Sequence, residues 1–111
     1  MSETRIVINV VAFKEAGGWV AQCLQYDIAA QADTYEDLRR ELQEIVISHI
    51  IVDAELGREA FSGLPEAPSK FWTMYGEGRP SDDDLPIAEQ SHSLSVASKI
   101  KIAGSSVEAH C

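Results

Sequence analysis

The stretch DTYEDLRRELQEIVISHIIVDAELG, residues 33–57, decides the fold, because it contains neither proline nor glycine before its last residue. Thr34 is a good N-cap, since its hydroxyl can accept a hydrogen bond from a free amide of the first helical turn. Asp37 stands at the position from which a capping-box side chain bonds back to the cap. Gly57 can end the helix in a left-handed conformation. The stretch therefore predicts one long helix.

Apolar residues recur along this helix at steps of four and three, which predicts one buried face. The predicted face comprises Leu38, Leu42, Ile45, His49, Val52 and Leu56. Residues 45–52 are apolar nearly all round, whereas a helix on one sheet needs an apolar stripe of only about 100°. A second face should therefore be covered, either by the segment after residue 60 or by another subunit. The candidate interface residues are Ile47, Ile50, Ile51, Trp72 and Tyr75.

Three short segments before the helix have the composition of β-strands. Residues 5–14, RIVINVVAFK, are rich in β-branched side chains and contain no breaker. Ala16-Gly17-Gly18 suits the turn of a hairpin, residues 19–24 return as a second strand, and residues 28–32 form a third that leads into the helix. The order predicted is three antiparallel strands followed by one helix.

The region after Gly57 has a different character. Residues 61–90 contain all four prolines and little periodicity, so residues 58–93 are predicted to be a loop-rich covering segment. Within it, a short helix beginning at Ser69 would carry Phe71, Trp72 and Tyr75 over the exposed face of the long helix. Asp82-Asp83-Asp84 is interpreted as a solvated turn, because its spacing does not suit a calcium loop.

Residues 94–103, LSVASKIKIA, alternate between apolar and polar side chains. Leu94, Val96, Ile100 and Ile102 would face the core, with Lys99 and Lys101 on the other side. This pattern predicts a half-buried strand that completes the sheet as a lysine-guarded edge, or that pairs with a partner subunit. The fold class predicted is α+β in a single domain, residues 1–111, with its core in residues 5–57 and a tail over residues 104–111.

Composition narrows the possible functions. The net charge is −9, from 18 acidic and 9 basic residues, which disfavours direct binding to nucleic acid. The sequence has no apolar run of membrane-spanning length and no signal-peptide pattern at its start, and two cysteines are too few for a disulfide framework. We therefore expect a cytoplasmic protein without membrane contact.

No residue pattern indicates catalysis. His49, His92, His110, Cys23 and Cys111 are the soft metal ligands, and no pair has the short spacing of a zinc site. Ser48 and His49 point about 100° apart on a helix and cannot form a nucleophile–base pair. Gly76-Glu77-Gly78 lacks the setting of a phosphate loop. We therefore predict no catalytic residue, no cofactor and no metal, and a protein that is not an enzyme.

Two segments resemble a known family. The strand WVAQCL at residues 19–24 and the helix start ADTYEDL at residues 32–38 resemble the corresponding parts of the HicB family of antitoxins and antitoxin-like proteins. The resemblance covers residues 5–50. It implies a small three-stranded sheet with a long helix and a fourth strand, similar to a truncated ribonuclease H fold without nuclease activity. It also implies a role in binding and masking a small basic RNA-cleaving toxin.

This chain departs from the family pattern in three places. The connection at residues 24–30, LQYDIAA, lacks the usual proline and glycine, and Ala32 stands where glycine is common. The C-terminal region lacks a helix-turn-helix or ribbon-helix-helix pattern, in agreement with the acidic charge. The chain resembles the partner-binding half of such a protein alone.

Three functions remain open from the sequence. The first is a non-enzymatic protein that binds a small basic toxin and whose acidic surface speeds association. The second is a stand-alone homodimer or higher oligomer with an unknown or regulatory role. The third is an enzyme or small-ligand binder with Trp19, Trp72 and Tyr75 around a pocket.

Overall fold

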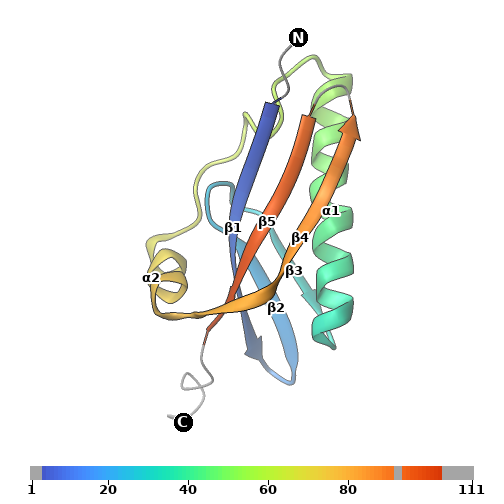
Figure 1. Ribbon diagram of the computed structural model, residues 1–111. Helices are drawn as coiled ribbons and strands as arrows, with labels where there is room; N and C mark the ends of the chain where they lie inside the picture. Colours follow the sequence, from blue (N-terminus) through green and yellow to red (C-terminus); the bar gives the residue numbers. More distant parts are fainter. Residues whose placement is uncertain (1–3, 92–93, 104–111) are drawn as a thin grey trace.

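The computed structural model describes residues 4–91 and 94–103, with side chains for residues 6–79 and 96–103. The predicted tail at residues 104–111 lies outside this range, as do His92, His110 and Cys111. The elements in chain order are β1 (Thr4–Glu15), β2 (Gly18–Cys23), β3 (Ala29–Ala32), α1 (Tyr35–Glu55), α2 (Ser69–Glu77), β4 (Arg79–Ser91) and β5 (Leu94–Ile102) (Figure 1). The fold is α+β, as the sequence predicts.

The strands form one five-stranded mixed sheet in the order β3-β2-β1-β5-β4. β1, β2 and β3 pair antiparallel, which confirms that part of the prediction. β5 completes the sheet beside β1, but the two strands run parallel, so a purely antiparallel sheet was the wrong prediction. β5 is also not an edge, because β4 pairs with its other side. After α1 and α2, β4 and β5 form an antiparallel pair, and β5 runs in the same direction as β1.

β4 corrects the prediction that residues 58–93 contain only loops and a short helix. This strand contains Pro80, Pro86 and the three aspartates 82–84, which were interpreted as a solvated turn. Proline is tolerated because β4 pairs on one side only and its register with β5 shifts three times. Prolines and charged residues are common both in loops and in protected edge strands, so the sequence pattern could not distinguish the two.

The β1–β2 hairpin turns where two residues adopt positive φ. Ala16 has φ of 53° and Gly17 has φ of 83°, which glycine adopts without strain. Gly18 is needed for a different reason, because a Cβ at this position would lie 2.9 Å from the carbonyl oxygen of Ala32. The missing side chain lets the start of β2 pack closely against the end of β3.

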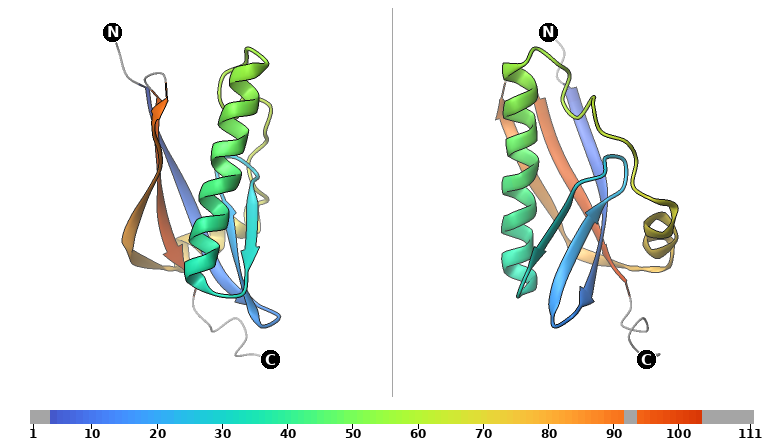
Figure 2. Two further views of the ribbon diagram at one scale, coloured as in Figure 1. Left: turned by 90° about the vertical axis from the view of Figure 1, so that its right-hand side faces the viewer. Right: turned by 180° about the vertical axis from the view of Figure 1, so that it is seen from behind.

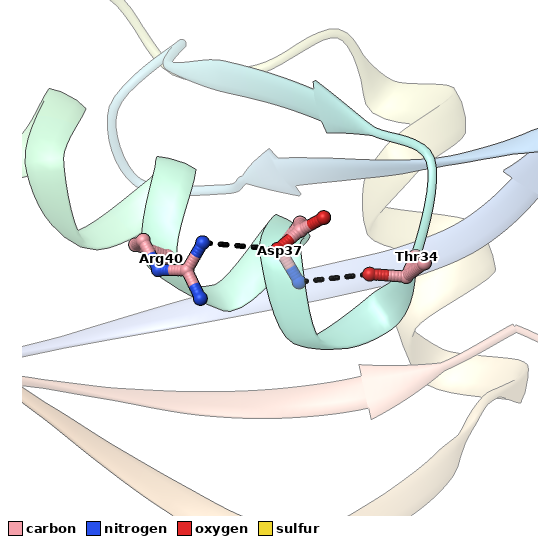
Figure 3. A network of polar contacts seen from close by, with 3 residues as sticks. All are labelled: Thr34, Asp37 and Arg40. Atoms are coloured by element: carbon pink, nitrogen blue, oxygen red, sulfur yellow. Dashed lines mark hydrogen bonds and ion pairs between the residues drawn. The ribbon is translucent and has the colours of Figure 1, made fainter.

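α1 begins and ends as the sequence predicts. The amide of Asp37 donates to the Thr34 hydroxyl at 3.1 Å (Figure 3), and Gly57 follows the helix with φ of 73°. The Asp37 carboxylate accepts from the Arg40 guanidinium at 3.0 Å, and no hydrogen bond between it and the cap is found among the described residues.

The buried face of α1 differs from the predicted one in its second half. The buried residues are Leu38, Leu42, Val46, Ile50 and Asp53. His49 is only half-buried, and Val52 and Leu56 are 48% and 61% exposed. Both sets satisfy steps of three and four, but the actual set continues by fours from Leu42. From residue 45 onward the buried positions each follow the predicted ones by one residue, which places the buried face about 100° around the helix axis from the predicted one.

The sheet separates two apolar clusters. On one face, Ile8, Val10 and Ala12 of β1 pack beneath Leu42 and Val46 of α1 in the larger cluster. On the other face, Val11 and Leu24 pack with Phe71, Met74 and Tyr75. The strands lie between α1 and α2 (Figures 1 and 2). Phe71 and Tyr75 of α2 therefore cover the sheet and not the exposed face of α1, and Trp72 is 38% exposed, which corrects the prediction.

The connection between the helices explains this placement. The amide of Asp27 donates to the carbonyl of Pro65, and the amide of Ala67 donates to the carbonyl of Leu24, at 2.8 and 2.9 Å. These bonds hold residues 65–67 against the loop between β2 and β3, so the chain reaches the face of the sheet opposite α1. α2 begins there at Ser69, whose side chain does not cap it because Pro68 occupies the N-cap.

Candidate functional site

The five predicted interface residues do not form one surface. Ile47 and Ile50 pack against the larger cluster, and Ile50 is only 8% exposed within a single chain. Ile51 points outward and is 51% exposed. Trp72 and Tyr75 belong to α2 on the opposite side of the sheet. Substitution of Ile50 would therefore disturb the core of one chain, whereas Ile51 and Trp72 are accessible to a partner at separate places.

Tyr75 belongs to a hydrogen-bonded polar group of side chains, with Asn9 and Gln25, on the face of the sheet opposite α1. The Asn9 side-chain amide donates to the Tyr75 hydroxyl at 2.7 Å, and the Gln25 side-chain amide donates to the side-chain Oδ1 of Asn9 at 2.7 Å. The Asn9 backbone amide donates to Gln25 in return at 2.9 Å. Lys101 lies 4.6 Å from the centre of the Tyr75 ring. These contacts give Tyr75 a structural role in docking α2.

The C-terminal part of α1 exposes apolar side chains. Ile51, Val52 and Leu56 are each about half exposed or more, at 51%, 48% and 61%. The sequence pattern placed Val52 and Leu56 in the buried stripe, so it missed this surface. An exposed apolar group of this kind on a helix end is typical of a contact with another protein.

The carboxylates at the start of α1 belong to the helix and not to a catalytic pair. Asp37 caps through its amide and pairs with Arg40 through its carboxylate (Figure 3). Both side chains are about half exposed, 49% for Asp37 and 60% for Arg40. Acidic side chains here also suit the positive end of the helix dipole.

Asp53 is a buried carboxylate at the end of α1. It accepts from the Phe61 amide and from the Arg58 guanidinium, both at 2.8 Å. The Phe61 hydrogen bond lowers the pKa of Asp53, burial opposes this, and Arg58 lowers the pKa further. Phe61 has φ of 66° and stacks on Tyr26 with ring centres 4.7 Å apart. Asp53 therefore ties the loop after α1 to the core.

The Cys23 thiol is not a nucleophile in this environment. Burial raises the pKa of Cys23 to about 12, so the thiolate is scarce at neutral pH. Its side chain packs in the larger cluster as a small apolar group. Among the described side chains, those of residues 6–79 and 96–103, no group of three His, Cys, Asp or Glu is placed to hold a metal ion.

Two shallow hollows lie along β3, and no sequence pattern predicted them. One, of about 300 Å³, is lined by Glu15, Gly17, Trp19 and Asp33, among others. The other, of about 430 Å³, reaches from Val20 and Gln31 to Ile45 of α1. Trp19 stacks edge-on with Tyr35 at 5.2 Å and lines only the first hollow. Trp72 and Tyr75 line neither, so the three aromatics considered for a ligand pocket do not meet in these hollows.

Comparison with known proteins returned no relatives. No protein-family model, no curated protein and no solved structure matches this chain. Neither described helix is long and apolar enough to cross a membrane.

Proposed function

We propose that this chain is a non-enzymatic interaction protein of the cytoplasm, resembling HicB antitoxins, that binds and masks a small basic RNA-cleaving toxin. The topology carries the proposal. Three antiparallel strands, one long helix and a later strand beside β1 agree with the fold that the resemblance implies. β4 adds a strand to this arrangement.

Charge supports the same partner class. The chain has a net charge of −9, and acidic side chains on the outer face of α1, such as Glu41 and Glu44, are exposed. A negative surface attracts a basic partner and raises its association rate at low ionic strength.

The test is co-purification followed by growth rescue. The tagged chain is incubated with host extract at low salt and at about 0.5 M salt, where surface charges are strongly screened. We expect one small basic protein to bind at low salt and to be released at high salt. Expressed alone, that protein should stop growth and cleave RNA, and co-expression of this chain should restore growth. A captured protein without RNA-cleaving activity would contradict the proposal.

A second candidate function is favoured by the exposed end of α1. Ile51, Val52 and Leu56 could form an apolar seam in a stand-alone homodimer with a regulatory role. This candidate predicts a dimer whose mass, measured by light scattering, does not change with salt. Ile51→Asp should convert it to a monomer without loss of the fold, because Ile51 is 51% exposed. A salt-independent monomer in the unmodified chain would contradict it.

A further inference from the structure

The two edges of the sheet differ in how they are protected. β4 contains two prolines and three consecutive aspartates, which are residues that discourage pairing with another strand. β3 reads Ala-Ala-Gln-Ala and contains no proline and no charge. β3 is therefore the edge without proline or charge, and it lies beside α1 (Figure 2).

The hydrogen-bonding pattern of β3 shows which backbone groups face outward. The Cys23 amide donates to the carbonyl of Ile28 at 2.9 Å, and the register then pairs Ala21 with Ala30. Backbone groups alternate in direction along an antiparallel strand, so those of Ala30 face β2 and those of Ala29 and Gln31 face the free edge. Two amides and two carbonyls are thus available for an added strand.

The surface around this edge has the shape that an added strand needs. The hollow of about 430 Å³ is lined by Ala29, Gln31 and Ile45, so it passes from the strand to the flank of α1. A small apolar side chain of an added strand could rest there against Ile45. Side chains of alternate residues would point to the opposite face.

Charge decides what can occupy the edge. Asp27 and Asp33 flank β3 and are exposed, and Glu15 lines both hollows. One carboxylate oxygen of Asp27 accepts from the Gln22 side-chain amide at 2.8 Å, which leaves the other oxygen for a basic group. The described residues that line the two hollows include no lysine or arginine. A second copy paired antiparallel about Ala30 would place its own Asp33 opposite Asp27, and like charges in such pairs are destabilising. A basic segment would meet opposite charges at the same places.

We propose that the free edge of β3 binds an extended basic segment of the partner protein by strand addition, with a basic residue at each end of the segment near Asp27 and Asp33. This inference rests on the proposed function for its partner class and adds the mode of binding. Main-chain hydrogen bonds supply the affinity, and the flanking acids select a basic sequence.

The probe is a capped peptide, Lys-Val-Thr-Val-Thr-Val-Lys, added to the isotope-labelled full chain and followed by amide NMR. We expect protection from hydrogen exchange at the amides of Ala29 and Gln31. The control peptide Glu-Val-Thr-Val-Thr-Val-Glu has the same strand propensity and the opposite charge, and it should bind at least about tenfold more weakly. Equal binding of the two peptides, or protection elsewhere, would overturn the inference.

Two further variants separate hydrogen bonding from side-chain effects. Gln31→Pro removes one outward amide and should weaken binding of the lysine peptide by about tenfold, whereas Gln31→Ala retains the amide and should bind normally. Methylation of the threonine amides of the peptide should have a similar effect without any change to the protein. Unchanged binding of the methylated peptide would also overturn the inference.

The failure of this inference is distinguishable from that of the proposed function. A basic toxin that is captured equally well by the unmodified chain and by Gln31→Pro would overturn strand addition and leave the function standing. Peptide binding at β3 in a chain that captures no toxin would support the binding mode and contradict the toxin-masking function alone.

Discussion

The face of the sheet beneath α1 is packed with aliphatic side chains, whereas the face beneath α2 has a hydrogen-bonded polar group among its apolar contacts. Ile8, Val10, Leu42 and Val46 are almost completely buried on the first face. On the second face, Asn9, Gln25 and Tyr75 are partly buried and bonded to one another. The first face therefore contributes most of the burial that stabilises the fold, and the second fixes where a short helix docks.

The comparison teaches how one strand serves two purposes. Successive side chains of β1 alternate between the faces, so Val10 enters the larger cluster while Asn9 and Val11 face α2. β1 is the central strand of the sheet, and around Val10 its two faces are covered by α1 on one side and α2 on the other. Substitutions one residue apart should consequently have very different effects.

The largest effect is expected from Leu42→Ala beneath α1. Leu42 is 1% exposed, and removal of a buried leucine side chain leaves a cavity that costs about 2–5 kcal/mol of unfolding free energy. Leu56→Ala is the matched control on the same helix, because Leu56 is 61% exposed and should change stability by less than about 0.5 kcal/mol. Urea denaturation measures both. Similar losses for the two variants would mean that Leu56 is buried in solution by another copy or a partner.

A smaller effect, with a defined pH dependence, is expected from Asp53→Asn at the end of α1. Folding lowers the pKa of Asp53, so the folded state is stabilised above the ordinary carboxyl pKa of about 4 and loses this stabilisation as pH falls through the lowered value. The variant should lose about 1–2 kcal/mol at neutral pH, because a charge-assisted hydrogen bond becomes a neutral one.

The pH dependence provides the control for Asp53. The difference in unfolding free energy between the unmodified chain and Asp53→Asn should shrink below about pH 4, where Asp53 of the unfolded state becomes protonated, and the charge contribution should be lost once the pH has fallen through the lowered pKa of the folded state. Glu55→Gln changes an exposed carboxylate two residues away and should show a much smaller difference. A difference between the unmodified chain and Asp53→Asn that is independent of pH would show that the Asp53 charge does not contribute.

Local signals in the sequence predicted the local structure well. The cap at Thr34, the turn at Gly17 and the end of α1 at Gly57 each depend on residues that lie close together in the chain. The pairing of β5 with β1 and the docking of α2 depend on contacts between distant segments, such as the bond from Ala67 to Leu24. The periodicity of the sequence alone could not predict these contacts between distant segments.

The candidate site was less accessible to sequence analysis. An edge is a property of strand order, so Ala29 and Gln31 could not be recognised as lying on one until β3 was shown to pair with β2 alone. Of the predicted interface residues, Ile51 and Trp72 are exposed, and Ile50 is part of the core because the buried face continues by fours from Leu42. The pattern of apolar residues predicts which side chains are buried within one chain, whereas a surface for a partner can be recognised only from the complete strand order.

The smallest effect is expected from Tyr75→Phe on the α2 face. The change removes only the hydroxyl that accepts from Asn9, and a partly buried hydrogen bond contributes about 0.5–1 kcal/mol. Asn9 keeps its two bonds to Gln25, so the polar group should remain in place. Thr73→Val is the control, since the Thr73 hydroxyl is exposed and bonds only within α2. A loss as large as that of Leu42→Ala would mean that docking of α2 is required for folding of the whole sheet, and the division between a stabilising face and a positioning face would be wrong.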